Sequence, residues 1–490
     1  MIHRNAGTIF AAVVLTLMLH EVLAAAKDYN PENAKTDPAA LSAENIPFVH
    51  TYNLTALFPV GAAALGQSAG GSQLLTLDDC IDRALSGNPA HAKARENMRG
   101  IKPAKLLAWG NYIPTLRSNY GMSQSNRTSS FVDDSGVLRT SGGISKSSYG
   151  SLNMNLNLFN AGRHYFDLKN ADLLRRERES RLSASELSIV DQVRRAYIDA
   201  LRQQQLLSAA ESQAQNRHEQ LRLAQARHSV GSVTRLDVLQ AQVDLKDQEL
   251  VIIQRRNNLE QARMQLNRLM GGTLDADFEV VDQFDVEQLN LNLNSMIEQA
   301  IASHPDIAAL EHQIGQQNNL LWMGRLSYLP TISTGINYSR SEDGLELIPN
   351  LQKGRGLSLN VSWNIWDSFQ RHNNNRRMEI QLNNLIYDLS SAKMDLEQNV
   401  RRFWLDVQRL YEQHLALSES RDLRQQSLEL EQERYRLGAA SLLDLRQAQT
   451  DYSQAEVNFI NSKYEFHTSL SSLSESVGQR VERLLEGLRQ

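Results

Sequence analysis

The sequence predicts a mainly α-helical protein with a transmembrane β-barrel portion, in which one half-chain architecture is used twice. Three observations lead to this fold class: a tandem repeat of about 210 residues, two very long stretches without proline, and four segments in which apolar and small polar residues alternate. The repeat is far longer than the unit of a solenoid. It therefore indicates one architecture built twice from a duplicated half.

The repeat is visible in the spacing of matching residues. The segment LDDCIDRALSGNPAHAKARENMRGIKPAKLLAWGNYI, which starts at Leu77, runs into Pro114-Thr115, and the segment that starts at Leu293 reaches Pro330-Thr331 at the same spacing. Further on, GSVTRLDVLQAQ from Gly231 matches GAASLLDLRQAQ from Gly438. We therefore divide the chain into repeat 1 (75–290) and repeat 2 (291–490).

Each repeat contains the same predicted elements in the same order. For repeat 1 we expect a first helix at about 77–112 with a kink at Pro103, strands at about 115–124 and 148–159 around a Ser/Gly-rich loop, a long helix at about 163–228 and a short helix at about 233–270. For repeat 2 we expect a first helix at about 294–328, strands at about 331–340 and 356–366, a long helix at about 371–437 and a short helix at about 441–477.

The long helices contain no proline and almost no glycine, so each could run for roughly 100 Å at 1.5 Å per residue. The two short helices of a repeat together match the long helix in length, so they could stack end to end beside it. The segment from Gly271 to about Leu291 would then form an equatorial collar around that junction.

The strands carry one apolar face and one face of Ser, Asn and Gly. A soluble half-buried sheet usually exposes Lys, Glu and Thr, whereas a small, uncharged face suits the wet lumen of a membrane barrel. Aromatic residues gather near the strand ends, as in an interfacial girdle: Tyr112, Tyr149, Phe159, Tyr328, Tyr338, Trp363 and Trp366. A soluble antiparallel sheet with aromatic residues in its core is the alternative.

The start of the chain predicts export. Arg4 supplies a positive region, Ile9 to Leu19 is apolar, and Ala24-Ala25-Ala26 offers a cleavage site, so residues 1–26 are a predicted signal peptide. The alternative, a membrane anchor, would need about 20 apolar residues. Residues 27–74 are predicted to form an extended N-terminal strap. The one cysteine, Cys80, is expected to be a buried thiol, so neither a disulfide nor a lipidated N-terminal cysteine is predicted.

Several function classes are excluded by what the sequence lacks. The net charge of −5 and the absence of a basic stripe argue against nucleic acid as a partner. We find no HExxH, no Gly-rich phosphate loop and no nucleophile elbow, and histidines such as His218 and His228 are scattered along predicted helices. We therefore predict no enzyme activity, no cofactor and no metal site.

Four strands cannot close a membrane barrel, because known barrels have at least about 8 strands and an open edge in lipid leaves backbone groups unpaired. The chain is therefore expected to form oligomers. Two copies would supply eight strands and three would supply twelve, and periodicity does not choose between them.

From about Leu75 onward the chain resembles the TolC family of outer-membrane efflux proteins. The resemblance rests on Tyr-x-Pro-Thr at Tyr112 and Tyr328, on the strand ends LFNAGR from Leu158 and IWDSFQR from Ile365, and on the paired Gly-x5-Asp-x2-Gln-Ala-Gln turns. It implies a homotrimer in the outer membrane of a Gram-negative-type cell, in contact with its lipid. A twelve-stranded barrel, four strands per chain, would continue into a long periplasmic α-helical barrel.

The resemblance also implies a function and partners. The protein would be a channel-tunnel that passively conducts substrates out of the cell in a tripartite efflux or type I secretion system. A periplasmic adaptor and an inner-membrane pump of the RND or ABC type would supply control and energy. The cargo, whether drug, metal or polypeptide, cannot be read from the sequence.

The turns between long and short helices are the candidate functional site. The resemblance makes them the tips that contact the adaptor: Val230, Gly231, Ser232, Val233 and Thr234 in repeat 1, and Leu437, Gly438, Ala439, Ala440 and Ser441 in repeat 2. For the glycines, the alternative is a tight helix–helix turn without a partner.

The same resemblance places Asp237 and Asp444 at the periplasmic pore entrance, although a helix-capping or solvated carboxylate is an equal alternative. Some family members carry a second acidic ring three residues later. This chain has Gln240 and Gln447 there, which argues against a strongly cation-binding constriction.

Arg434, Tyr435 and Arg436 are a possible latch that would hold the tips shut by hydrogen bonds, unless the two arginines are simply solvated. Two rival functions are a periplasmic adaptor and a structural coiled-coil protein. An adaptor would need a lipoyl-like domain and a single hairpin, and a coiled-coil protein would leave the alternating strands without a purpose.

Overall fold

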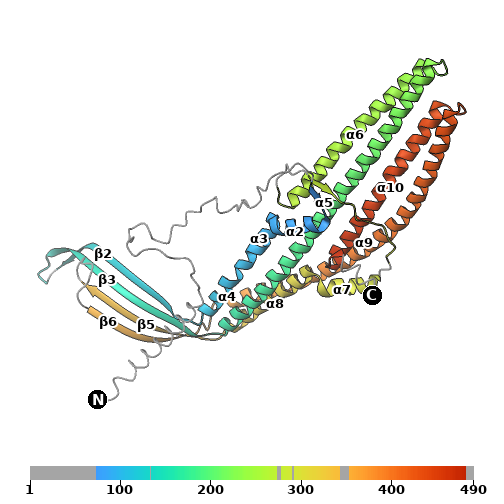
Figure 1. Ribbon diagram of the computed structural model, residues 1–490. Coiled ribbons are helices and arrows are strands. Elements are labelled where there is room, and N and C mark those ends of the chain that lie inside the picture. Colours follow the sequence, from blue (N-terminus) through green and yellow to red (C-terminus); the bar gives the residue numbers. More distant parts are fainter. Residues whose placement is uncertain (1–72, 133, 273–277, 290–291, 343–351, 482–490) are drawn as a thin grey trace, which may run out of the picture. The chain divides into compact units, whose positions relative to one another are not determined.

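A computed structural model describes residues 73–132, 134–272, 278–289, 292–342 and 352–481 (Figure 1). All of them belong to one compact unit, Ser72–Gln490. The expected signal peptide and the strap up to residue 72 lie outside the described residues.

The first helical segment of each repeat is broken, where we expected one helix per repeat, with a kink at Pro103 in repeat 1. In repeat 1 it forms α2 (Leu77–Gly87), α3 (Pro89–Arg99) and α4 (Ile101–Gly110), and in repeat 2 it forms α7 (Leu293–Ser303) and α8 (Pro305–Leu326). Asn88 and His304 have extended backbones because a residue before proline is driven out of the α region. Pro103 itself lies in the first turn of α4, where its missing N–H costs nothing.

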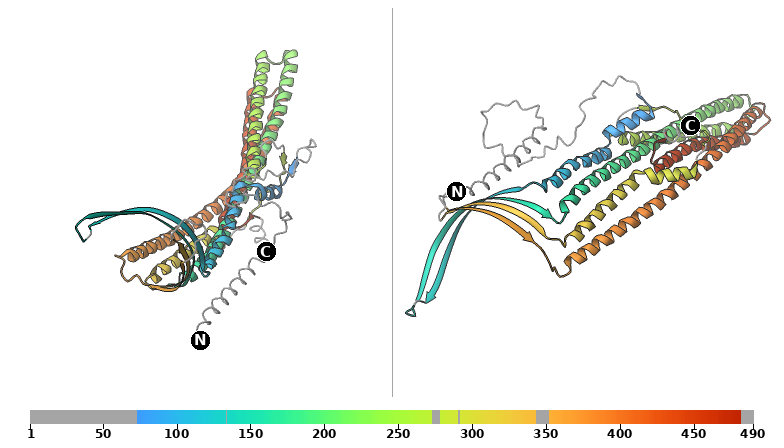
Figure 2. Two further views of the ribbon diagram at one scale, coloured as in Figure 1. Left: turned by 90° about the vertical axis from the view of Figure 1, so that its left-hand side faces the viewer. Right: turned by 90° about the horizontal axis from the view of Figure 1, so that it is seen from below.

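Four antiparallel strands form one sheet in the order β2-β3-β5-β6. Their bounds are β2 (Thr115–Val132), β3 (Leu138–Asn160), β5 (Thr331–Glu342) and β6 (Gln352–Ser362). The sheet curls, and the β2–β3 hairpin extends beyond β5 and β6 (Figure 2).

Two expectations about the strands were wrong. The segment that we expected to be a Ser/Gly-rich loop is mostly a paired ladder, in which Ser125 lies opposite Ser145. Backbone hydrogen bonds build this ladder without an apolar face, so the sequence gives no period-2 signal there. The last strand ends at Ser362 rather than near residue 366, and Trp363 Nε1 instead donates to the carbonyl oxygen of Tyr328 at 3.0 Å.

The register confirms that the two faces of the sheet differ in chemistry. One row across all four strands is apolar: Leu116, Met154, Ile336 and Leu357. The adjacent row, which points to the opposite face, is small and polar: Thr115, Asn155, Gly335 and Ser358. On that polar face Asn337 Nδ2 donates to Asn153 Oδ1 at 2.7 Å.

The long rods follow the strands directly. Hairpin 1 consists of α5 (Arg163–Ser229) and α6 (Arg235–Leu269), and hairpin 2 consists of α9 (Gln370–Arg436) and α10 (Leu442–Val477). Since α5 and α9 have 67 residues each, each spans roughly 100 Å. The helices pack in the order α6-α5-α10-α9, because α5 contacts both α6 and α10, and α10 also contacts α9.

The shorter helices of each repeat pack one after another along its long helix, as expected. Helices α3 and α4 pack on α5 together with α6, and α8 packs on α9 together with α10. The segment that we expected to form a collar supplies β4 (Phe278–Val280), which pairs in parallel with β1 (Gln73–Leu75).

The chain just after β4 is fastened to both repeats. The hydroxyl of Tyr197 on α5 donates to the Val281 carbonyl oxygen at 2.7 Å. Asp282 Oδ2 accepts hydrogen bonds from Lys463 Nζ and the Tyr464 hydroxyl on α10, both at 2.8 Å. Burial alone would raise the pKa of Asp282, but these hydrogen bonds outweigh it and hold that pKa below its ordinary value.

Cys80 on α2 is fully buried, as predicted, in the hydrophobic core that β1 and β4 share with α5. Burial raises the pKa of its thiol to about 12, so the thiol remains protonated and unreactive.

The tyrosine of each Tyr-x-Pro-Thr motif packs on the start of a long helix. Tyr112 lies against the ring of His164, with centroids 5.1 Å apart. Tyr328 lies under the guanidinium of Arg371 at 4.4 Å, and Arg371 also binds Asp367 at 2.6 Å. The motif therefore fixes the point where strand becomes helix in both repeats.

Candidate functional site: the helix tips and the contacts between the hairpins

Both tips are closed by the same glycine turn. Gly231 and Gly438 have φ of +77° and +78°, in the left-handed region that glycine adopts most readily. In each turn the glycine N–H and the next N–H donate back to the last turn of the long helix. These bonds run from Gly231 to His228 and from Ser232 to Arg227 at tip 1, and from Gly438 to Tyr435 and from Ala439 to Arg434 at tip 2. The pattern is a Schellman C-cap at both tips.

Each short helix then starts with a capping box. The Thr234 hydroxyl and N–H donate to Asp237 Oδ2 at 2.8 and 2.9 Å, while the Asp237 N–H donates to the threonine oxygen. Ser441 and Asp444 repeat this arrangement at 2.8 and 3.1 Å. The hydrogen bond from the Ser441 hydroxyl, followed by that from its N–H, lowers the pKa of Asp444. Both aspartates therefore act as helix-capping carboxylates in one chain.

The two glutamines form equivalent contacts one turn later. Gln240 Nε2 donates to Asp244 Oδ1 at 3.4 Å, and Gln447 Nε2 donates to Asp451 Oδ1 at 2.9 Å. Each glutamine is therefore held along its own helix by the aspartate four residues on.

Large apolar side chains surround the tip turns and lie in solvent. Val230 and Leu437, which close the long helices, are 75% and 70% exposed. Leu236 and Leu443, which open the short helices, are 71% and 72% exposed. A pair of exposed apolar side chains at each tip is a surface that a helical partner could cover.

Of the three proposed latch residues, Tyr435 joins the two hairpins. It is buried, and the guanidinium of Arg227 on α5 lies over its ring at 4.8 Å. Arg227 also donates to the main-chain oxygens of Tyr435 and Arg436 at 2.8 and 2.6 Å. Arg434 and Arg436 instead pair along their own helix, with Glu431 at 2.5 Å and with Glu433 at 2.6 Å.

Sequence reasoning missed Arg227 because the residue has no distinctive motif. It occupies the same place in repeat 1 as Arg434 in repeat 2, four residues before the tip glycine. That equivalence was the available signal, but only tertiary packing gives the two arginines different partners.

Further polar contacts join the hairpins below the tips. Arg446 on α10 pairs with Asp244 on α6 at 3.0 Å, and Ser453 donates to Gln213 on α5 at 2.9 Å. Arg217 donates to the buried Gln449, and burial lowers the pKa of Arg217. These side chains join α10 of hairpin 2 to both helices of hairpin 1, so they resist separation of the hairpins.

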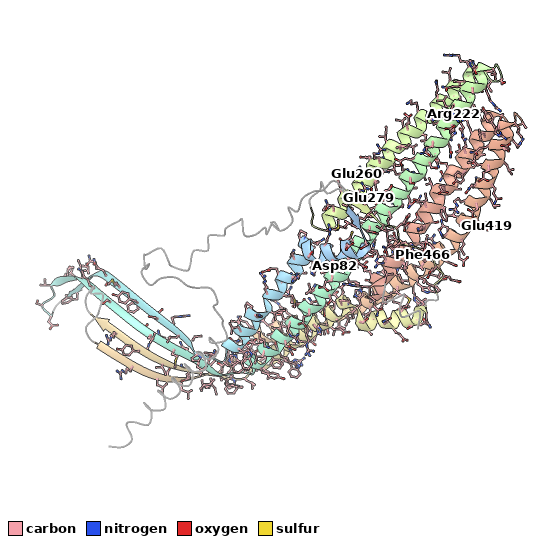
Figure 3. The ribbon with its side chains drawn as sticks, in the orientation of Figure 1. Asp82, Arg222, Glu260, Glu279, Glu419 and Phe466 are labelled. Carbon is pink, nitrogen blue, oxygen red and sulfur yellow. The ribbon has the colours of Figure 1, made fainter. Side chains whose placement is uncertain are left out.

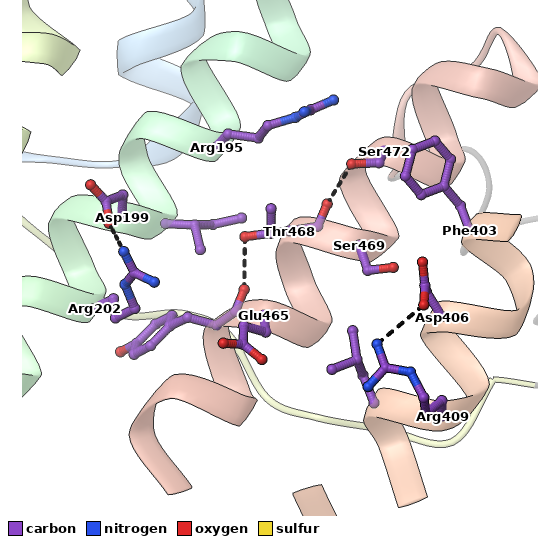
Figure 4. Close-up of a pocket in the computed structure, with 13 residues that line it drawn as sticks. Arg195, Asp199, Arg202, Phe403, Asp406, Arg409, Glu465, Thr468, Ser469 and Ser472 are labelled. Atoms are coloured by element: carbon purple, nitrogen blue, oxygen red, sulfur yellow. Dashed lines mark hydrogen bonds and ion pairs between the residues drawn. The ribbon is translucent and has the colours of Figure 1, made fainter. Parts of the chain in front are cut away.

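A cleft of about 430 Å³ lies farther from the tips, between α5, α9 and α10 (Figure 4). Its charged side chains are mostly neutralised locally, since Arg202 pairs with Asp199 and Arg409 pairs with Asp406. Tyr464, whose hydroxyl donates to Asp282, also lines the cleft together with Glu465 and Ser472.

Within the described ranges, no group of three or more His, Cys, Asp or Glu side chains could hold a metal ion. No helix in that part of the chain is long and apolar enough to cross a membrane.

The chain matches the model of the outer membrane efflux protein family over residues 80–272 and 296–479, so one match covers each repeat. The chain belongs to this family. Its members are channel-forming proteins of the outer membrane rather than enzymes, and the chain is an outer-membrane channel protein of an efflux or type I secretion system.

Individual relatives are distant. Alkaline protease secretion protein AprF of Pseudomonas aeruginosa is 23% identical over 46% of this chain, and the match spans only 48% of that protein. Outer membrane efflux protein BepC of Brucella suis is 20% identical over 82% of this chain and 85% of its own length. The crystal structure of the Campylobacter jejuni CmeC outer membrane channel has a TM-score of 0.71 at 16% identity and covers 84% of this chain and 89% of that one. This last likeness concerns the fold.

Proposed function

We propose that three copies of this chain form one tube, with a twelve-stranded barrel in the outer membrane and a helical barrel in the periplasm. The observation that carries the proposal is the four-stranded sheet, whose edge strands β2 and β6 have no partner within the described chain. Its apolar row suits lipid and its polar row suits a wet lumen. An open edge in lipid would leave backbone groups unpaired, so further copies must complete the ladder.

The outer helices support the same assembly. Helices α6 and α9 lie at the two ends of the helix order, and both carry exposed apolar side chains along their length. The exposed residues are Leu236, Leu239, Val243, Leu250 and Ile253 on α6, and Tyr387, Met394, Leu423 and Leu430 on α9 with Leu437 just after it. The α6 residues are spaced by three, four or seven, and Tyr387 and Met394, like Leu423, Leu430 and Leu437, are spaced by seven, as in a coiled-coil seam. In the tube, α6 of one copy would pack against α9 of the next.

The tips would form the closed periplasmic end. Asp237, Asp444, Gln240 and Gln447 would surround the entrance, and the exposed tip residues would contact a helical periplasmic adaptor. The Arg227–Tyr435 contact would act as the latch, because it ties hairpin 1 to hairpin 2 beside the entrance. An inner-membrane pump of the RND or ABC type would supply energy and cargo, while the channel conducts passively.

The route to the membrane and the cargo are also proposals. A signal peptide at 1–26 would direct export, with 27–74 as a strap that carries no lipidated cysteine. AprF is named for protease secretion and BepC for efflux, so both kinds of cargo are candidates for this chain.

The assembly is tested by extraction in mild detergent, light scattering and electron microscopy. We expect a mass of three chains and a tube with a rod roughly 100 Å long. Leu430→Glu, which charges the exposed α9 stripe, should reduce the trimer fraction. Glu419→Lys on the exposed surface of the same helix is the control and should leave it unchanged (Figure 3). A monomeric wild type would contradict the proposal.

A further inference from the structure

A carboxyl pair joins the two repeats where α5 packs on α10, with Asp191 buried and the Glu475 side chain 32% exposed. Asp191 on α5 is 5% exposed, and its Oδ1 accepts a hydrogen bond from Ser471 Oγ on α10 at 2.7 Å. Arg195 on α5 lies 2.5 Å from Asp191 Oδ2 and 3.0 Å from Glu475 Oε2 on α10. Two carboxyl groups, one from each repeat, therefore share one guanidinium.

The repulsion between the two carboxyl groups depends on one proton. With both groups ionised, two like charges meet at one nitrogen of Arg195 in a half-buried helix contact, which is costly. One proton on the pair removes this repulsion and allows one carboxyl group to donate to the other. Burial, followed by the neighbouring Asp191 carboxylate, raises the pKa of Glu475 to about 7 in spite of Arg195.

Other charged groups lie on the elements around this pair. Arg194 on α5 and Arg480, which follows α10, both line the same small cavity as Asp191 and Glu475. At the α7–α8 junction, His304 bonds to the Glu475 backbone, and burial lowers the pKa of its ring. On α9, the cleft charges Asp406 and Arg409 pair at 3.1 Å, so they add no net charge.

We propose that Asp191 and Glu475 share one proton and act as a pH-sensitive lock, which holds α5 against α10 while the proton is bound and loosens when it leaves. Helices α5 and α10 belong to different hairpins, so the lock would control how easily hairpin 1 and hairpin 2 separate. In this respect the inference rests on the proposed channel function. The lock itself is a property of the fold and can be measured separately.

The sign of the effect follows from linkage. Because the folded state raises the pKa of Glu475 above its ordinary 4.5, its contribution to stability is full below pH 4.5 and is lost as pH rises to about 7. His467 acts in the opposite direction, since burial lowers its pKa to about 4 and its contribution is lost as pH falls below 6.5. A comparison with a Glu475 variant cancels the histidine effect.

The test is the Tm of the detergent-extracted full-length protein between about pH 5 and pH 8.5. Glu475→Gln mimics the protonated carboxyl group, so its Tm should stay close to wild type at the acidic end and exceed it at the alkaline end, with a gap that widens above pH 4.5 and is complete by about pH 7. Glu465→Gln, on the exposed face of the same helix, is the matched control and should show no such gap. A wild-type-to-E475Q gap that is constant with pH would overturn the lock.

Two further measurements keep the outcomes distinct. If E475Q fails to fold, the shared proton can be followed in wild type by infrared spectroscopy. The carbonyl band of a protonated carboxyl group should be present at acidic pH and disappear near pH 7. Absence of this band at acidic pH would refute the shared proton. In lipid bilayers, wild type should open more often at about pH 8.5 than at about pH 6, and E475Q should open equally at both. A pH-dependent Tm gap without any conductance would support the lock and contradict the channel proposal.

Discussion

Arg227→Ala removes the contact that ties hairpin 1 to the tip of hairpin 2, and we expect it to open the channel. The guanidinium makes two hydrogen bonds, at 2.8 and 2.6 Å, and lies over the Tyr435 ring at 4.8 Å. Hydrogen bonds from a charged donor contribute about 1.5–3 kcal/mol each, and a cation–π contact at an exposed site about 0.5–1 kcal/mol.

Because Arg227 is partly exposed, water replaces part of these interactions when they break. We therefore assign the Arg227 contacts a net contribution of about 3 kcal/mol per chain to the closed tips. Each 1.4 kcal/mol is a factor of about ten, so the ratio of open to closed tips should rise about a hundredfold per chain. The assay is the open probability of the purified protein in planar lipid bilayers.

Arg222→Ala is the control, since Arg222 is 75% exposed on the same helix and pairs with Glu219 at 2.8 Å (Figure 3). Tyr435→Phe keeps the ring and the main-chain oxygen, so it should change the open probability little, whereas Tyr435→Ala should raise it. Equal open probabilities for Arg227→Ala and Arg222→Ala would refute the latch.

Three further predictions concern the turns, the thiol and the collar. Gly438→Ala should destabilise the fold by about 1–2 kcal/mol through its left-handed φ alone, because no atom lies within 4 Å of the added carbon. Gly136→Ala is the control, since Gly136 has φ +75° and the same open space, and it should lower the Tm equally. A transport defect found only in Gly438→Ala would favour contact with a partner over a turn that merely joins two helices. Cys80 should not react with a thiol reagent until the protein is denatured, and rapid native labelling would contradict its burial. Asp282→Asn should lower the Tm at neutral pH, and this difference from wild type should close as pH falls below 3.8. The reason is that Asp282, whose pKa is lowered in the folded state, stabilises the fold only while it is ionised. A difference that does not change with pH would argue against the ion pair.

Patterns that depend on neighbouring residues were readable before the structure. The duplicated element order and the long helices follow from local period and from the lack of proline. The capping boxes at Thr234 and Ser441 follow from an aspartate three residues later, at helix position N3. The β2–β3 extension was missed because a ladder of Ser, Thr and Gly has no apolar period. The break at Asn88 was also missed, although Pro89 drives the residue before it out of the α region.

The sequence by itself determined the duplicated architecture, the two-faced strands and the position of the tips, because these depend on residues close together in the chain. Tertiary structure alone decided which side chains meet across the repeats. Arg227 and Arg434 are equivalent in sequence, yet Arg227 binds the other hairpin while Arg434 pairs with Glu431. Ser471 likewise meets Asp191 across 280 residues. No local pattern encodes such contacts, because they depend on which helices the packing order brings side by side.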